Sequence, residues 1–135
     1  MSEENIKIVR RVYELFNQRD DAAFEELIAP DAKFRFVEWG PFPKRTYEGR
    51  EAAIAGEYWQ DIFSAFPDFH MEPEAIVSGG DYVVATIHNT GRGSGSGVEV
   101  EARTGVLVEI RDAKLARLEV FETRAEALEA AGLSH

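Results

Sequence analysis

The chain has 135 residues, of which 44% are hydrophobic, and these are enough for one domain with a substantial core. Its formal charge of −10 argues against nucleic acids and anionic membranes as partners, because both bind to positive surfaces. The sequence contains no cysteine, which excludes disulfides and thiolate metal sites, and no apolar run approaches the ~20 residues that cross a bilayer. The acidic first residues are unlike a secretory signal, so we expect a cytoplasmic protein with one domain over 1–135.

Apolar residues recur at helical spacing in the first part of the chain. The pattern predicts a helix over residues 3–18, with Ser2 and the acids after it at its start. Asp20 or Asp21 can cap a short second helix that continues to about Ile28. In both segments the apolar residues gather on one face, which indicates that the two helices pack on a common core.

The apolar period then changes to that of a strand. Pro30 marks the change because proline cannot continue a helix, and the alternation over residues 33–39 predicts the first strand. A loop with two prolines follows at 40–44. A third helix is expected over 48–66, where one apolar stripe recurs. The stripe consists of Ile54, Tyr58, Trp59, Ile62, Phe63 and Phe66.

The second half of the chain has the period of strands. The expected strands are 69–77, 82–92, 98–110 and 114–122, and the expected final helix is 124–131, ended by Gly132. A glycine–serine segment at 91–97 lacks the lysine and the following helix of a phosphate loop, so it is interpreted as a flexible hairpin tip. Helices followed by an antiparallel sheet indicate an α+β protein.

Several local strings resemble the nuclear transport factor 2-like superfamily, and more narrowly its SnoaL-like polyketide cyclase and ketosteroid isomerase branch. The strings are Val9–Asn17, Ala29–Ala32, Tyr47–Ala52, Ala65–Phe69, Arg111–Leu115 and Arg124–Leu128. The resemblance implies a cone-shaped, curved antiparallel sheet, or half-open barrel. Three helices from the first half of the chain would pack with it around an apolar pocket, with a short helix at the C-terminus. The resemblance also implies a homodimer formed through the sheets.

Enzymes of this branch typically move a proton next to a carbonyl group, with a buried carboxylate as base and a hydrogen-bond donor for the enolate. By resemblance, the catalytic tyrosine falls near Val12, the base at Phe36 and the acidic donor at Val106. The aspartate of cyclase-like relatives falls at Thr123. Each of these positions lacks the expected chemistry, so the catalytic candidates must come from neighbouring residues.

Glu122 and His88 are the candidate catalytic residues. Glu122 alternates in phase with Leu118 and Val120, which predicts that it points into the cone, where desolvation raises the pKa of a carboxyl group. His88 is in phase with Val84 and could form an acid–base pair with Glu122 across the pocket. The alternative for Glu122 is that the strand frays before it, which leaves Glu122 solvated or paired with Arg124. The alternative for His88 is a place at the rim or the dimer interface, because the opposite row of its strand is more apolar.

A molecule in the apolar pocket would contact both helices and sheet. The candidate ligand-binding residues are Tyr13, Phe16, Phe36, Glu38, Tyr58, Trp59, Phe63, Val106, Val108 and Val120. Aromatic residues on the apolar stripe of a helix are more often part of the core than of a binding site, and core packing is the alternative for Tyr13 and Tyr58. The inward row from Val98 to Ile110 carries one hydroxyl, on Thr104, and no ionisable group. No histidine and carboxylate spacing is typical of a metal site, and no cofactor is expected.

Three functions remain open from the sequence. The first is a cofactor-free isomerase or cyclase that moves a proton on a small apolar carbonyl compound. The second is a module that binds a small hydrophobic molecule without turning it over. The third is a dimeric scaffold whose pocket is filled by its own side chains. The placement of the polar residues around the pocket distinguishes the first function from the other two.

Overall fold

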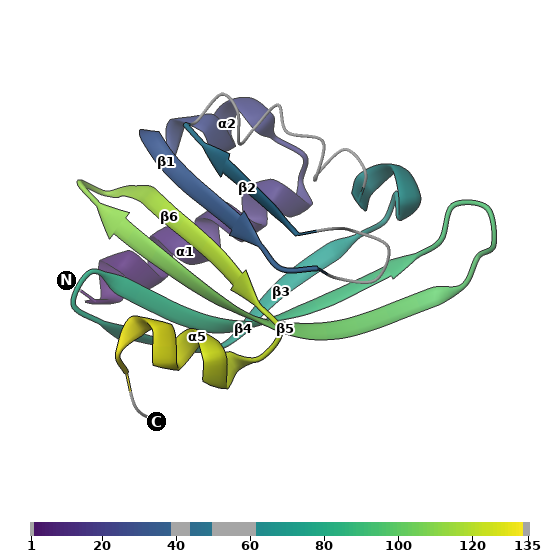
Figure 1. The fold of residues 1–135 in the computed structure, drawn as a ribbon. Coiled ribbons are helices and arrows are strands. Elements are labelled where there is room, and N and C mark those ends of the chain that lie inside the picture. Colours follow the sequence, from purple (N-terminus) through teal and green to yellow (C-terminus); the bar gives the residue numbers. More distant parts are fainter. Residues whose placement is uncertain (1, 39–43, 50–61, 134–135) are drawn as a thin grey trace.

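The computed structural model describes residues 2–38, 44–49 and 62–133 (Figure 1). The first half contributes helices α1 (Ser2–Asn17) and α2 (Asp21–Glu26), followed by strands β1 (Ile28–Phe36) and β2 (Arg45–Glu48). The second half contributes strands β3 (His70–Gly79), β4 (Tyr82–Arg92), β5 (Glu99–Arg111) and β6 (Lys114–Phe121), and the final helix α5 (Arg124–Ala131). Residues 62–65 are also helical.

The strands form one curved sheet in the order β2-β1-β6-β5-β4-β3 (Figure 1). Neighbouring strands run antiparallel except for β1 and β6, which pair in parallel. A parallel pair needs a crossover connection, and the whole segment between β1 and β6 supplies it. The α+β class with an open, curved sheet is confirmed, while this one parallel pair differs from the fully antiparallel sheet that we expected.

The first strand begins earlier than the sequence pattern predicts. β1 starts at Ile28 rather than at residue 33, and Pro30 lies inside it. The pairing of β1 with β6 shifts register between Ile28 and Lys33, so the proline occupies an irregular part of the ladder. Proline has no N–H to donate to a ladder, so within sheets it is tolerated at irregular positions of this kind, where a ladder hydrogen bond is already missing. The change from helix to strand therefore falls next to Leu27, three residues before the proline.

The expected start of the third helix at Glu48 is wrong. Residues 45–48 form the edge strand β2 instead, in which Glu48 pairs with Lys33 of β1. Gly49, with φ of 90°, ends this strand in a conformation that suits glycine. The centre of the expected helix, including Tyr58 and Trp59, lies outside the described residues. Its last part is helical as predicted.

The sheet has an inner face that packs against the helices of the first half and an outer face that carries α5. The inner face and α1 share one apolar cluster, which includes Val12, Phe34, Phe36, Val106 and Leu118. A second, smaller cluster lies on the outer face, where Val84 packs with Ala127 and Leu128 of α5. Among the described residues, no helix is long and apolar enough to span a membrane.

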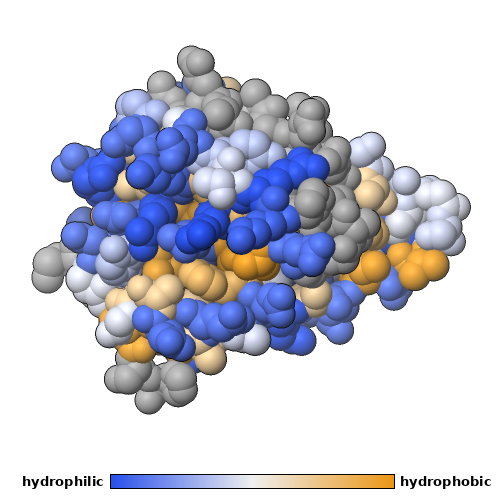
Figure 2. All heavy atoms as spheres, viewed as in Figure 1, coloured by the Kyte–Doolittle hydropathy of each residue, from blue (hydrophilic) through white to orange (hydrophobic). Residues whose placement is uncertain are grey.

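Helix α5 has well-formed ends that fix it on the outer face. Thr123 and Glu126 form a reciprocal capping box at its start, and Gly132 ends it with φ of 71°. Figure 2, seen from the same side as Figure 1, shows mainly hydrophilic residues on this face, with an apolar strip beside α5. The helix thus covers Val84 and its neighbours on the outer face, and the apolar strip beside the helix stays in view.

Candidate functional site

The inner row of β4 is the more apolar of its two rows. Val83, Ala85 and Ile87 belong to the main apolar cluster, and Asn89 continues their alternation at the end of the row. His88 therefore lies on the opposite, outer face. The predicted inward orientation of His88 is wrong.

His88 instead belongs to an ionic cluster on the outer face. Its Nε2 lies 2.5 Å from a carboxylate oxygen of Glu101, and its Nδ1 lies 3.8 Å from Glu74. Arg103, which pairs with His88 across the strands, also contacts Glu74 at 3.3 Å. The carboxylate partners of His88 are thus Glu74 and Glu101, and the structure does not bring it together with Glu122 inside the cone.

Glu122 lies just beyond the last residue of β6 and is exposed. Val120, two residues earlier, packs against the main apolar cluster, so the predicted phase of this row is correct up to that point. The ladder between β5 and β6 ends at the pair of Gly105 and Phe121, so Glu122 directly follows the last paired residue of β6. Glu122 is therefore a rim residue of the cone. The following residue, Thr123, caps α5 with its hydroxyl group.

Asn89 and Thr104 are the buried polar residues of the described inner face. They keep 7% and 9% of their surface exposed, and all other described buried residues are hydrophobic or glycine. The Nδ2 of Asn89 donates to Oγ1 of Thr104 at 3.2 Å, and also to the carbonyl oxygens of Ile87 and Ala102 at 3.1 Å each. Both side chains are neutral, so the buried polar side chains on the inner face of the sheet form a hydrogen-bonding pair without charge.

Among the described residues, the ligand-binding candidates lie in or against the main apolar cluster, except for Glu38. Tyr13, Phe16, Phe36, Val106 and Val108 are buried in the main cluster, and Phe63 and Val120 pack against it. Phe16 and Phe63 stack edge to face, with ring centroids 5.9 Å apart. Glu38 is exposed beyond the end of β1. Tyr58 and Trp59 lie outside the described residues.

Sequence reasoning did not single out Asn89. The signal was available, because Asn89 follows Val83, Ala85 and Ile87 at strand spacing and interrupts an otherwise apolar row. This signal indicates a buried polar residue only when the row of β4 that contains Asn89 is assigned to the inner face of the sheet. The hydroxyl of Thr104 was recognised as the single polar group of its own row.

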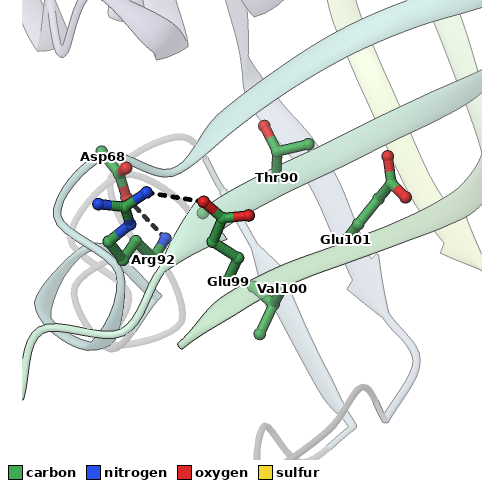
Figure 3. A pocket seen from close by; sticks show the side chains of 7 residues that line it. Asp68, Thr90, Arg92, Glu99, Val100 and Glu101 are labelled. Carbon is green, nitrogen blue, oxygen red and sulfur yellow. Dashed lines mark hydrogen bonds and ion pairs between the residues drawn. The ribbon is translucent and has the colours of Figure 1, made fainter. Parts of the chain in front are cut away.

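Polar and charged residues make up most of the lining of two surface hollows among the described residues. The first, of about 480 Å³, is drawn in Figure 3 and is lined by Asp68, Thr90, Gly91, Arg92, Glu99, Val100 and Glu101. In it, Arg92 bonds Asp68 through its backbone N–H at 2.8 Å and Glu99 through its guanidinium at 2.7 Å. The second is lined by Arg10, Glu14, Asn17, Gln18, His70, Glu72 and Pro73. These linings differ from the mainly hydrophobic and aromatic side chains that line a typical small-molecule site.

The described residues contain no group of three or more histidine, cysteine or acidic side chains that could hold a metal ion. The polar chemistry at hand on the inner face is therefore hydrogen bonding by Asn89 and Thr104, with one carboxylate at the rim. Such a set can bind and orient a neutral molecule within apolar walls.

The sheet, the helices on its inner face and this apolar interior define an NTF2-like cone fold. Residues 9–118 match the SnoaL-like domain family, and the chain belongs to that family. None of the curated proteins matches the chain significantly.

Solved structures of similar fold cover nearly the whole chain. A protein from Jannaschia sp. CCS1, classed with SnoaL-like polyketide cyclases, has a TM-score of 0.76 at 21% identity, over 100% of this chain and 96% of its own. IdmH from Streptomyces antibioticus, assigned as a polyketide cyclase, has a TM-score of 0.73 at 24% identity, over 96% and 99%. TerC, co-crystallised with polyporic acid, has a TM-score of 0.72 at 21% identity, over 93% and 96%. At these identities the likeness shows the fold.

Proposed function

We propose that this chain binds a small, largely hydrophobic molecule inside the cone of its sheet. The observation that carries the proposal is the composition of the described inner face, which is apolar apart from two neutral, hydrogen-bonded side chains, Asn89 and Thr104. Small-molecule sites typically combine apolar walls with a few placed polar groups. A scaffold filled only by its own side chains would gain nothing from placing polar groups there, because a buried polar group costs free energy unless it is fully paired.

Two further points support a ligand of this kind. Phe63 and Val120 pack only partly buried against the core cluster, so the apolar surface continues beyond the sealed core. A relative of the same fold, TerC, has been crystallised with polyporic acid. For this chain, the hydrophobic character of the ligand is inferred from the apolar residues of its own inner face.

The proposal is tested by narrowing the cone with a larger side chain. Val120→Phe should weaken the binding of naphthalene, followed through the fluorescence of the ligand, by at least roughly tenfold, because the added ring occupies the ligand volume. The matched control is Val98→Phe, since Val98 is 59% exposed near the hairpin tip. Equal affinity in both variants, with unfolding transitions like that of the wild type, would argue against a ligand in the cone.

A second candidate function, proton transfer on an enolisable ketone, is favoured by the position of Glu122. Glu122 directly follows the last paired residue of β6 and is in phase with Leu118 and Val120, which pack on the inner face. A carboxylate at the edge of an apolar site can act as a general base when a substrate lies against it. Two relatives of the same fold are assigned to polyketide cyclases. In this proposal Glu122 acts without His88, and no cofactor is required.

This second candidate is tested by hydrogen–deuterium exchange at the carbon next to the carbonyl of 2-tetralone, measured by NMR in heavy water. The wild type should accelerate the exchange, and Glu122→Gln should lower the rate at least roughly a hundredfold, towards the uncatalysed rate, because the amide cannot accept the proton. The exposed Glu129→Gln of α5 is the control for the same change of charge. An unchanged rate in Glu122→Gln would remove Glu122 as the base.

We also infer that two copies of the chain associate through the outer face of the sheet. Helix α5 covers one end of this face, where Val84 is buried beneath it. The remainder, around Thr86 and His88, carries paired charges of both signs, which suits a polar interface between identical surfaces.

A further inference from the structure

We propose that Asn89 and Thr104 together anchor one hydroxyl group of the bound molecule. The ligand would then be a neutral aromatic alcohol or enol, such as a phenol on a fused ring system. This inference rests on the proposed binding function and specifies the chemistry of that same site. It assigns a ligand-orienting role to two residues on adjacent central strands, β4 and β5.

The amide of Asn89 is held in one orientation by its nitrogen. An amide nitrogen has two N–H donors, and those of Asn89 serve three acceptors, namely two backbone carbonyls and the hydroxyl oxygen of Thr104. Reversing the amide would set its oxygen against the two backbone carbonyl oxygens, which cannot donate a hydrogen bond. The nitrogen side is therefore fixed against the sheet, and the carbonyl oxygen is on the other side of the group.

Each member of the pair keeps one unused hydrogen-bonding function. Among the described residues, no donor bonds the Oδ1 atom of Asn89, and the Thr104 hydroxyl accepts a hydrogen bond without donating one. Two described side-chain atoms are fully buried and have no hydrogen-bond partner, namely the Nε atoms of Arg117 and Arg124. The Oδ1 atom of Asn89 is not among them, so it is not fully enclosed by the protein. A free acceptor and a free donor thus lie beside each other on an apolar, more than nine-tenths buried surface.

A single hydroxyl group completes both functions at once. It can donate its proton to Oδ1 of Asn89 and accept the proton of the Thr104 hydroxyl. A ligand carboxylate or phenolate would lack the proton for Asn89 and would face its carbonyl oxygen without a counter-charge, which disfavours anions. An ether or a ketone would satisfy Thr104 alone. The pair therefore selects a neutral hydroxyl over each of these groups.

Three probes of the same ring system separate the two hydrogen bonds. Naphthalene offers neither bond, 2-methoxynaphthalene can only accept, and neutral 2-naphthol can accept and donate. Their affinities for the wild-type protein at neutral pH are measured by fluorescence titration. We expect affinity to rise from naphthalene to 2-methoxynaphthalene and again to 2-naphthol, by roughly five- to tenfold at each step.

Two nearly isosteric variants should each remove one step. Thr104→Val removes the donor, so 2-methoxynaphthalene should bind no better than naphthalene. Asn89→Leu removes the acceptor, so 2-naphthol should bind no better than 2-methoxynaphthalene. The control is Thr46→Val on the exposed edge strand β2, which should keep both steps. The comparison of the probes on the wild type needs no variant and remains decisive if a variant fails to fold.

The outcomes separate this inference from the proposed function. Equal binding of all three probes to the wild type would overturn the anchor and leave ligand binding in the cone standing. Unchanged steps in both folded variants would overturn the anchor in the same way. Failure of all three probes to bind would overturn the proposed function and this inference with it.

Discussion

At the scale of single residues, Arg19 stands out because it has a backbone conformation that glycine usually supplies. Its φ is 58°, and it follows α1 in a helix-ending motif: the N–H of Arg19 bonds the carbonyl of Phe16, and the N–H of Asp20 bonds that of Leu15. A left-handed conformation costs a residue with a side chain about 1 kcal/mol. The side chain of Arg19 must therefore contribute contacts that offset this cost.

Those contacts connect the end of α1 to the segment that follows the 62–65 helix. The guanidinium donates to the carbonyls of Phe16 and Asn17 at 3.3 and 3.1 Å, and to those of Pro67 and Phe69 at 3.1 Å each. It also lies 3.6 Å from the ring centroid of Phe63. Burial lowers the pKa of Arg19 from its ordinary value, an effect that Asp68 opposes, and the guanidinium keeps its charge at neutral pH.

We predict that Arg19→Gly and Arg19→Ala both destabilise the protein, and that alanine is the worse of the two. Either change removes the four carbonyl contacts, which should lower the free energy of unfolding by roughly 1–3 kcal/mol. Alanine also keeps the backbone strain that glycine relieves, so it should cost about 1 kcal/mol more. Urea unfolding followed by circular dichroism measures both values. A glycine variant as stable as the wild type would mean that the guanidinium contacts contribute nothing.

At the scale of elements, local signals in the sequence were sufficient to predict the ends of several helices and strands. The capping position at Asp20, the capping box at the start of α5 and the stop at Gly132 each depend on residues within one turn of the chain. The hairpin turn at Asp112 and Ala113 is local too. The extents of α1, β4, β6 and α5 could therefore be predicted to within about one residue, because nearby turn and capping residues mark their ends.

Elements that depend on a distant partner were missed. β2 has four residues, too few to show a period, and it exists because Thr46 and its neighbours pair with β1. The early start of β1 has the same cause, since Ile28 pairs with Leu115 of β6, far along the chain. Strand pairing at this separation is set by the tertiary structure, which overrides local propensity.

The inner face of β4 was difficult to choose for a different reason. Val84 lies on the outer row, yet it is fully buried because α5 packs over it. Both rows of the strand are therefore apolar at that end, and the alternation that identifies a half-buried strand is lost. The outer position of His88 and the inner position of Asn89 become evident only when α5 is placed, and this is why the sequence identified the wrong polar residue on this strand.

Gly105 shows that a strand glycine can predict a contact without naming the partner. A Cβ atom at this position would lie 2.2 Å from the carbonyl oxygen of Thr123, so the turn between β6 and α5 passes directly over β5. Glycine inside a strand often marks such a close approach of backbone. The sequence alone could therefore predict that another backbone segment lies close to Gly105. Identifying that segment as the one that contains Thr123 required the structure.

At the scale of the whole molecule, charge and shape together bear on self-association. The long β4–β5 hairpin extends well beyond α5, so the outer face of these strands is left uncovered by that helix (Figure 1). The chain carries a formal charge of −10, and two copies therefore repel each other at long range. The ion pair of Arg103 with Glu74 neutralises part of this charge on the proposed interface itself.

We predict a dimer whose stability rises with salt, because screening reduces the long-range repulsion over a Debye length of about 10 Å at 0.1 M ionic strength. Sedimentation equilibrium at low and moderate ionic strength measures the dissociation constant. Thr86→Glu places an unpaired carboxylate at the half-buried centre of the outer face and should weaken the dimer at least roughly tenfold. Thr46→Glu, on the exposed edge strand β2, changes the net charge equally and should leave the dimer unaffected. A chain that stays monomeric at every ionic strength would exclude this face as the interface. Equal dissociation constants for the two variants would exclude it as well, since only a local effect at Thr86 distinguishes the two substitutions.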